Sequence, residues 1–208
     1  MNVPMNVVAI DGPVGSGKST VAQAVAVRLG LDFLQTGAMY RAVALALLRR
    51  GNEEAATVAR EVVIDVGDRV TLDGDDVTDQ IRRPEVGRAV SLVAADAEVR
   101  AELVRLQREW AVVHGGGVVE GRDIGSVVFP DAVLKVFLTA SPEERASRRD
   151  DESADDVRRR DLIDSTRAAS PLVVADGAVV VDSTGRGVDE VVDEIVALFQ
   201  AKAEAGAG

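Results

Sequence analysis

One stretch near the N-terminus constrains the fold of this chain more than any other feature. Residues 12–20 fit the pattern G-x-x-x-x-G-K-S/T and follow the apolar run at residues 7–10. Glycines let the backbone curl around an anion with its N–H groups pointing inward, and a helix starting near Lys18 adds the positive end of its dipole. Lys18 can then reach the outer phosphates of a nucleotide, and Ser19 can hold magnesium. The pattern therefore predicts a phosphate-binding loop between a buried strand and a helix.

Length, charge and composition exclude several classes of protein. A chain of 208 residues is long enough for one α/β domain with a small insertion. The formal net charge of -11 opposes nonspecific binding to nucleic acid or anionic lipid, so an anionic ligand needs a locally basic pocket. The absence of cysteine excludes disulfides and thiol catalysis. Without a signal-peptide pattern or a long apolar run, we expect a cytoplasmic protein with no membrane or nucleic-acid partner.

Hydrophobic periodicity predicts strands and helices in alternation, as in a buried parallel sheet. The expected strands are residues 6–10, 31–34, 118–119, 133–138 and 178–181. The expected helices are residues 18–29, 37–50, 53–66, 99–113 and 188–199, with a frayed tail at 201–208.

A hairpin signal interrupts this alternation. Residues 70–77 alternate and contain the turn pair Asp73-Gly74, and Pro84 fits the first turn of a helix. These features predict a small inserted subdomain between about residues 66 and 97. The expected fold class is α/β, with a P-loop NTPase core whose central parallel sheet is flanked by helices, an inserted α+β subdomain and a short lid.

The lid is predicted from a dense polar stretch at residues 141–167. Arginines on both sides flank the acidic run at residues 150–156. The stretch is either a mobile lid that folds arginines over phosphates or a solvated helical hairpin whose charges satisfy one another. A phosphotransferase needs positive charge on the migrating group and must exclude water, which favours the lid.

Other candidate residues indicate the kind of acceptor. The segment at residues 120–123, Glu-Gly-Arg-Asp, follows a buried strand, where ligand groups of open α/β sheets belong. The sole histidine, His114, is expected at a helix end and not as a base. An acceptor phosphate has a second pKa near ~6 and needs no base at pH 7. Arginines and magnesium without an evident base therefore fit transfer onto a nucleoside monophosphate.

Four segments, at residues 12–20, 36–41, 120–132 and 160–172, closely resemble bacterial cytidylate kinase. The resemblance runs nearly end to end. Its Gly-Arg-Asp-Ile-Gly and Arg-Asp-x-x-Asp-Ser-x-Arg blocks separate this family from adenylate, guanylate and thymidylate kinases better than the loop does. The resemblance implies a nucleoside-monophosphate (NMP) binding insertion at 66–97, a lid at 149–170, and a P-loop core at 1–65, 98–148 and 171–208.

The resemblance also implies a reaction and its residues. A monomer would transfer the γ-phosphoryl group of ATP, with Mg²⁺, to CMP or dCMP in pyrimidine nucleotide metabolism. Lys18, Arg122 and Arg167 would be catalytic, and Ser19 would bind the metal. The implied ATP-binding residues are Gly12, Pro13, Val14, Gly15, Ser16, Gly17, Lys18, Ser19, Thr20, Arg149 and Arg158. The implied CMP-binding residues are Thr36, Tyr40, Arg41, Ser91, Arg100, Arg122, Asp123, Arg160, Asp164 and Arg167.

Within that set, the family implies that Ser91, Arg100 and Asp123 recognise cytosine. Cytosine presents an exocyclic amine as donor and a ring nitrogen and carbonyl as acceptors, which suits an aspartate beside an arginine. Uracil presents the opposite pattern, so UMP is expected to be a poor acceptor.

Two departures from the family keep alternatives open. Gln35 stands where the family commonly has aspartate, and only eight residues join Arg149 to Arg158, fewer than the family generally has. A small-metabolite kinase of the shikimate or gluconate type is one alternative. A catalytically weakened nucleotide-binding regulatory module is the other.

Overall fold

A computed structural model describes residues 6–51, 53–148 and 172–206 of the chain. The chain divides into two compact units, Met1–Phe33 with Ala111–Gly208, and Leu34–Trp110. The helix expected at residues 99–113 is present as Ala97–His114 and is shared between the units, with His114 at its end as predicted. The described helices include none long and apolar enough to cross a membrane.

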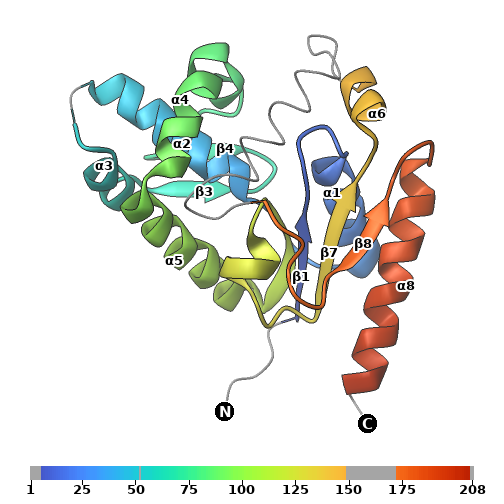
Figure 1. The fold of residues 1–208 in the computed structure, drawn as a ribbon. Helices are drawn as coiled ribbons and strands as arrows, with labels where there is room; N and C mark the ends of the chain where they lie inside the picture. The colour runs from blue at the N-terminus through green and yellow to red at the C-terminus, as the bar shows by residue number, and fades with distance from the viewer. Residues whose placement is uncertain (1–5, 52, 149–171, 207–208) are drawn as a thin grey trace. The chain divides into compact units, whose positions relative to one another are not determined.

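The larger sheet has five strands in the order β2-β6-β1-β7-β8, of which Figure 1 labels β1, β7 and β8. The strands are β1 (Asn6–Asp11), β2 (Phe33–Gln35), β6 (Gly116–Glu120), β7 (Leu134–Thr139) and β8 (Val179–Asp182). β1 pairs in parallel with β6 and β7, which places Val8 between Val118 and Leu134. β7 also pairs in parallel with β8. The central parallel sheet predicted from the β-branched runs is therefore confirmed.

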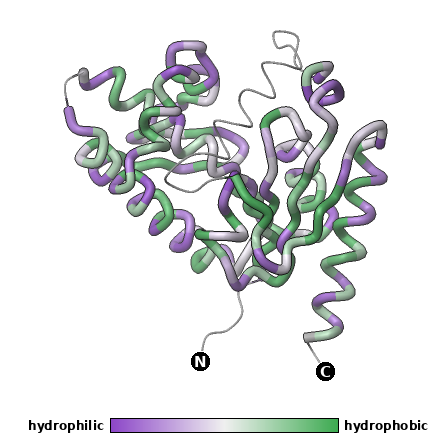
Figure 2. Tube along the Cα trace, in the orientation of Figure 1, coloured by the Kyte–Doolittle hydropathy of each residue, from purple (hydrophilic) through white to green (hydrophobic). Residues whose placement is uncertain are grey.

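Two helices pack against this sheet and each other, α1 (Lys18–Leu29) and α8 (Val188–Gly206). Val25 of α1 and Ile195 of α8 are fully buried in the core that contains Ile10 of β1. α1 ends at Leu29, as expected from the sequence, and its C-cap residue Gly30 has a left-handed φ of 65°. In Figure 2, α8 alternates between hydrophobic and hydrophilic stretches, as an amphipathic helix does.

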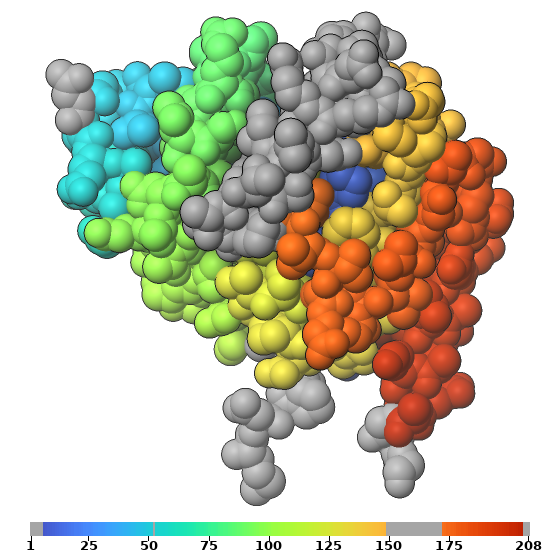
Figure 3. All heavy atoms as spheres, viewed as in Figure 1, coloured from blue at the N-terminus to red at the C-terminus, as the bar shows by residue number. Residues whose placement is uncertain are grey.

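The frayed tail expected at residues 201–208 is wrong for most of its length. α8 continues to Gly206. The reason is that residues 201–205, Ala-Lys-Ala-Glu-Ala, are strong helix formers, which extend the helix beyond its last apolar contact. In the view of Figure 3, α8 and the residues after 172 form a continuous part of the surface of the first unit.

The second unit combines helices with a small sheet. Its elements are α2 (Thr36–Arg50), α3 (Ala55–Glu61), β3 (Ile64–Val66), β4 (Val70–Leu72), β5 (Asp75–Asp76), η1 (Gln80–Arg82), α4 (Pro84–Ala95) and most of α5 (Ala97–His114). The predicted hairpin is β4–β5, whose turn residues Asp73 and Gly74 have φ of 54° and 89°. Pro84 begins α4, as predicted.

The helix expected at residues 53–66 is wrong in its second half. α3 ends at Glu61, and β3 follows and pairs antiparallel with β4. The run Val62-Val63-Ile64-Asp65-Val66 is β-branched at four of its five positions, so pairing with a neighbouring strand overrides the helical spacing read there.

The second unit is larger than the insertion expected at residues 66–97. α2 and α3 belong to it because α2 packs against both α3 and α4. The functional division into core, insertion and lid stays a prediction, and the expected lid at residues 149–170 lies outside the described residues.

Candidate active site

The phosphate-binding loop lies where the sequence places it, between the end of β1 at Asp11 and the start of α1 at Lys18. Gly12, Gly15 and Gly17 have φ of 150°, 76° and 85°, which side chains rarely adopt. A Cβ on Gly12 would also lie 2.0 Å from the main-chain oxygen of Leu138 in β7. The loop conformation therefore depends on glycine at these positions.

The interior of the loop has the chemistry of an anion site. Lys18 is 9% exposed and donates a hydrogen bond from Nζ to the main-chain oxygen of Pro13 at 2.8 Å. The Ser16 hydroxyl is fully buried and has no hydrogen-bond partner among the described residues. An ammonium group, an unpaired hydroxyl and the N-terminal end of α1 thus converge in one loop. This set fits a nucleotide phosphate.

Side chains from outside the loop hold its carbonyl oxygens. Arg145 of α6 (Pro142–Ser147) donates to the oxygen of Val14 at 3.3 Å and to that of Ala140 at 2.9 Å. Arg148 and the Ser183 hydroxyl each donate to the oxygen of Ser16, both at 3.2 Å. These bonds leave the N–H groups of the loop for a ligand.

Arg145 is buried, although it belongs to the dense polar stretch that begins at residue 141. Its side chain is 3% exposed. It can be buried because main-chain oxygens on both sides accept its guanidinium protons.

A carboxylate that sequence reasoning did not assign lies beside Ser19. Ser19 donates its hydroxyl proton to Oε1 of Glu120, at 3.0 Å, and Glu120 is 6% exposed at the end of β6. A hydroxyl and a carboxylate are hard oxygen ligands of the kind Mg²⁺ takes. Glu120 belongs to the segment at residues 120–123 that was expected to carry ligand groups, but the sequence does not show that Glu120 meets Ser19.

The described residues contain no group of three or more His, Cys, Asp or Glu that could hold a metal ion. Ser19 and Glu120 would therefore supply only part of a coordination shell. This fits Mg²⁺, which keeps several waters and is usually completed by substrate phosphates.

Asp11 is the second acidic residue that the sequence analysis did not assign. Its carboxylate accepts the main-chain N–H groups of Ile124 at 2.8 Å and Gly125 at 2.7 Å. The pKa of Asp11 is raised from 3.8 to about 6, chiefly by burial and also by the charge of Asp123, while the two N–H donors and Lys18 oppose the rise. Asp11 thus links the strand before the phosphate loop to the segment after β6.

That segment carries two expected site residues, Arg122 and Asp123. The N–H of Gly121 donates to the oxygen of Ile10 at 3.0 Å, which continues the β6–β1 ladder to the edge of the sheet. Asp123 is 6% exposed and Arg122 is partly exposed. The structure therefore brings both to the sheet edge that carries the phosphate loop, as expected for ligand groups of an open α/β sheet.

Five expected site residues lie in the second unit. Thr36 begins α2 and is 3% exposed. The guanidinium carbon of Arg100 lies 5.6 Å from the centre of the Tyr40 ring, a cation–π distance. Arg41 donates to the oxygen of Ile81 at 3.2 Å, and Ser91 is exposed on α4. The structure thus joins Tyr40 to Arg100 within this unit.

The remaining expected residues lie outside the described part of the chain. They are Arg149, Arg158, Arg160, Asp164 and Arg167.

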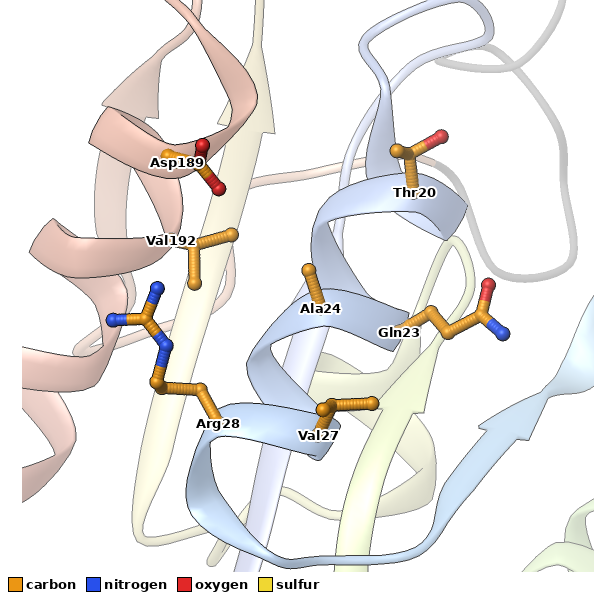
Figure 4. A pocket seen from close by; sticks show the side chains of 7 residues that line it. All are labelled: Thr20, Gln23, Ala24, Val27, Arg28, Asp189 and Val192. Atoms are coloured by element: carbon orange, nitrogen blue, oxygen red, sulfur yellow. The ribbon is translucent and has the colours of Figure 1, made fainter.

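Thr20, the last residue of the loop motif, is exposed and lines a shallow pocket between α1 and α8 (Figure 4). The pocket has a volume of about 380 Å³. Its lining residues are Thr20, Gln23, Ala24, Val27, Arg28, Asp189 and Val192. Arg28 is paired with Asp193 at 2.8 Å, so its charge is already matched.

The parallel sheet, the glycine loop and the buried lysine define a P-loop nucleotide-binding protein of the small-kinase kind. Solved structures share this fold. One is TT1252 from Thermus thermophilus, with a TM-score of 0.54 and 22% identity over 94% of this chain and 96% of that one. A gluconokinase from Sinorhizobium meliloti 1021 has a TM-score of 0.53 and 18% identity over 97% and 95%. These likenesses concern the fold alone.

Sequence comparison is more specific. The family model described as cytidylate kinase matches residues 8–201. Cytidylate kinase of Desulfitobacterium hafniense (strain Y51) is 49% identical over 96% of this chain and 94% of that protein. Cytidylate kinase of Mycobacterium leprae (strain Br4923) is 49% identical over 96% and 97%. The chain belongs to the cytidylate kinase family, which disfavours both the small-metabolite kinase and the regulatory module.

Proposed function

We propose that this chain transfers the γ-phosphoryl group of ATP to CMP or dCMP, giving ADP and CDP or dCDP. Membership of the cytidylate kinase family supports this reaction. On the chain itself, the phosphate loop carries the proposal, because Lys18 and the Ser16 hydroxyl, which has no hydrogen-bond partner among the described residues, are buried there together. We further propose that the enzyme is a cytoplasmic monomer, which the family and the absence of cysteine support.

On the donor side, the loop N–H groups and Lys18 bind the β- and γ-phosphates of ATP. Lys18 exchanges its hydrogen bond to Pro13 for one to a phosphate oxygen, so its ammonium group is held in place before the nucleotide arrives. Ser19 and Glu120 would hold Mg²⁺, which would neutralise charge on the phosphates when bound. Arg149 and Arg158 are proposed to add positive charge from the lid.

On the acceptor side, Arg122 and Arg167 are proposed to stabilise charge on the migrating phosphoryl group. Thr36, Tyr40 and Arg41 would bind the phosphate of CMP, and Arg160 and Asp164 the sugar hydroxyls. Ser91, Arg100 and Asp123 would read cytosine. An ionised acceptor phosphate needs no residue to take a proton, so charge stabilisation by arginine carries the reaction.

Steady-state ADP formation with CMP, dCMP, UMP and AMP, at fixed ATP and Mg²⁺, tests this proposal. We expect kcat/KM for CMP and dCMP to exceed that for UMP and AMP by at least about tenfold, because the wrong base leaves buried polar groups unpaired. Comparable turnover of UMP and CMP would remove the assignment of the cytosine site. Tight ATP binding without CMP-dependent ADP formation would favour a regulatory module instead.

A pair of arginine variants tests the acceptor site. We expect Arg122→Ala to lose CMP turnover and keep ATP binding, since Arg122 follows β6 and is not part of the phosphate loop. Arg28→Ala is the matched control, because Arg28 is exposed on α1 and forms an exposed ion pair with Asp193 of α8. Equal activity of the two variants would contradict the role of Arg122.

A further inference from the structure

The Asp11 carboxylate is buried and accepts the main-chain N–H groups of Ile124 and Gly125. The proposed function gives this contact no role. Asp11 ends β1, and its side chain is 4% exposed. Each of its two oxygens accepts one N–H group, Oδ1 from Ile124 at 2.8 Å and Oδ2 from Gly125 at 2.7 Å. Hydrogen bonds to an ionised acceptor at these lengths are among the stronger ones in proteins.

We propose that Asp11 is a positioning residue for the acceptor nucleotide, which fixes Arg122 and Asp123 by holding the N–H groups of the two residues that follow them. This inference rests on the proposed function. It adds a residue that lies next to the phosphate loop but acts on the acceptor side.

The local structure explains why these N–H groups need an outside partner. Ile124 and Gly125 begin η2 (Ile124–Val128), a single π-helical turn in which Phe129 donates back to the oxygen of Ile124 at 2.7 Å. The first N–H groups of any helix have no earlier carbonyl to bind. Asp123, which is in the capping position, makes no side-chain cap bond to this turn. Asp11 supplies that cap from a neighbouring strand.

The same strand end holds the segment on its other side. The N–H of Gly121 donates to the oxygen of Ile10 at 3.0 Å. Ile10 therefore binds the chain immediately before Arg122, and Asp11 binds it immediately after Asp123. The phosphate loop starts at the next residue, Gly12. The end of β1 therefore fixes both the start of this loop and the segment that carries Arg122 and Asp123.

An uncharged side chain at position 11 would not accept both N–H groups. Burial of the carboxylate disfavours its ionised form, and Asp123 adds repulsion, while Lys18 and the two N–H donors favour it. An asparagine at this position keeps one acceptor oxygen and turns an NH₂ group toward the second N–H, which leaves that donor buried and unpaired.

Asp11→Asn tests the proposal against Ser183→Ala, which removes a bond to the loop oxygen of Ser16 on the donor side. We expect Asp11→Asn to raise KM for CMP at least about tenfold and to lower kcat, with KM for ATP within about threefold of wild type, as loss of a charge-assisted hydrogen bond predicts. Ser183→Ala should raise KM for ATP more than KM for CMP. Equal effects of Asp11→Asn on CMP and ATP, or no effect on CMP, would overturn the proposal.

A second variant keeps Asp11 and moves its partner, in case Asp11→Asn does not fold. A Cβ on Gly125 would lie 3.1 Å from the Lys135 side chain and 3.4 Å from that of Ala175, so Gly125→Ala crowds the segment at the N–H group that Asp11 binds, away from the phosphate loop. It should show the same selective loss on the CMP side, and a loss shared equally with ATP would overturn the proposal. Wild-type protein in the same assay separates a failure of the proposed function from a failure of the role proposed for Asp11. Wild type without CMP turnover would contradict the proposed function, whereas an active wild type with unselective variants would contradict the role of Asp11.

Discussion

Ser19 of α1 and Glu120 of β6 are joined by a hydrogen bond of 3.0 Å between Oγ and Oε1, although 101 positions separate them in the chain. The bond links the phosphate loop to the segment that carries Arg122 and Asp123. It also brings a hydroxyl and a carboxylate together at the start of α1. Both are oxygen ligands that a nucleotide-bound Mg²⁺ could take.

Ser19→Ala should weaken magnesium use. Removal of the hydroxyl takes away one oxygen ligand and the hydrogen bond from Ser19 to Glu120, so we expect the Mg²⁺ concentration for half-maximal activity to rise about 10- to 100-fold. Ser19→Thr keeps the hydroxyl and is the matched control. Titration of ADP formation with Mg²⁺ measures the effect, and identical Mg²⁺ dependence in Ser19→Ala and wild type would contradict the assignment.

Asp11 should make folding stability depend on pH in a defined direction. Its pKa is raised from 3.8 to about 6 in the folded protein, so the folded state holds the proton more tightly than the unfolded state. The stability that this proton contributes is present below pH 3.8 and is lost as pH rises through about 6. The shift corresponds to about 3 kcal/mol.

Urea unfolding of wild type and Asp11→Asn between pH 4 and pH 7.5 measures this difference. We expect the free energy of unfolding of wild type to fall relative to that of the variant across this range, by up to about 3 kcal/mol. A difference between the two proteins that stays constant with pH would show that Asp11 titrates normally.

Gln35→Asp should stabilise the protein without lowering its turnover. Gln35 is the N-cap residue of α2, with extended φ and ψ of -90° and 92°, and its side chain makes no cap hydrogen bond. Aspartate is a favoured N-cap and carries a charge that suits the helix dipole, so we expect a gain of about 1 kcal/mol. Gln35→Ala is the control without a cap. A large loss of turnover in Gln35→Asp, measured with CMP, would show that glutamine is specifically needed.

Gln107→Met should raise stability. The Gln107 side chain is 1% exposed, and neither of its polar atoms has a hydrogen-bond partner in the part of the chain that the structure describes. Methionine has a similar length and no polar group to desolvate, so we expect the free energy of unfolding to rise by about 1 to 3 kcal/mol. Gln23→Met, at an exposed position on α1, should change stability by less than about 0.5 kcal/mol. A destabilised Gln107→Met protein in thermal or urea unfolding would contradict the prediction.

Local patterns predicted most of the fold. The loop motif gave the positions of β1 and α1, and the β-branched runs gave the parallel strands, because both signals are confined to short stretches of sequence. The prediction for residues 62–66 was wrong because a strand elsewhere in the chain determines their secondary structure. Residues 62–66 form β3 because β4 is available to pair with them, which helical spacing does not reveal.

The candidate site was predictable only in part. Lys18 and Ser19 belong to a short motif, and Asp123 to a family block, so each can be found in sequence. Glu120 and Asp11 act through contacts with residues 101 and 113 positions away, Ser19 and Ile124. A single sequence does not record which distant segments meet at the edge of the sheet, and so these two carboxylates were not assigned.

The destination of the γ-phosphoryl group of ATP tests the central claim most directly. ATP labelled in that group is incubated with CMP, Mg²⁺ and the purified protein, and the labelled products are separated. The account predicts that the label appears in CDP, with little in inorganic phosphate, because the γ-group passes to the acceptor phosphate while water is excluded. Label released mainly as inorganic phosphate, or retained in ATP when CMP is present, would contradict it.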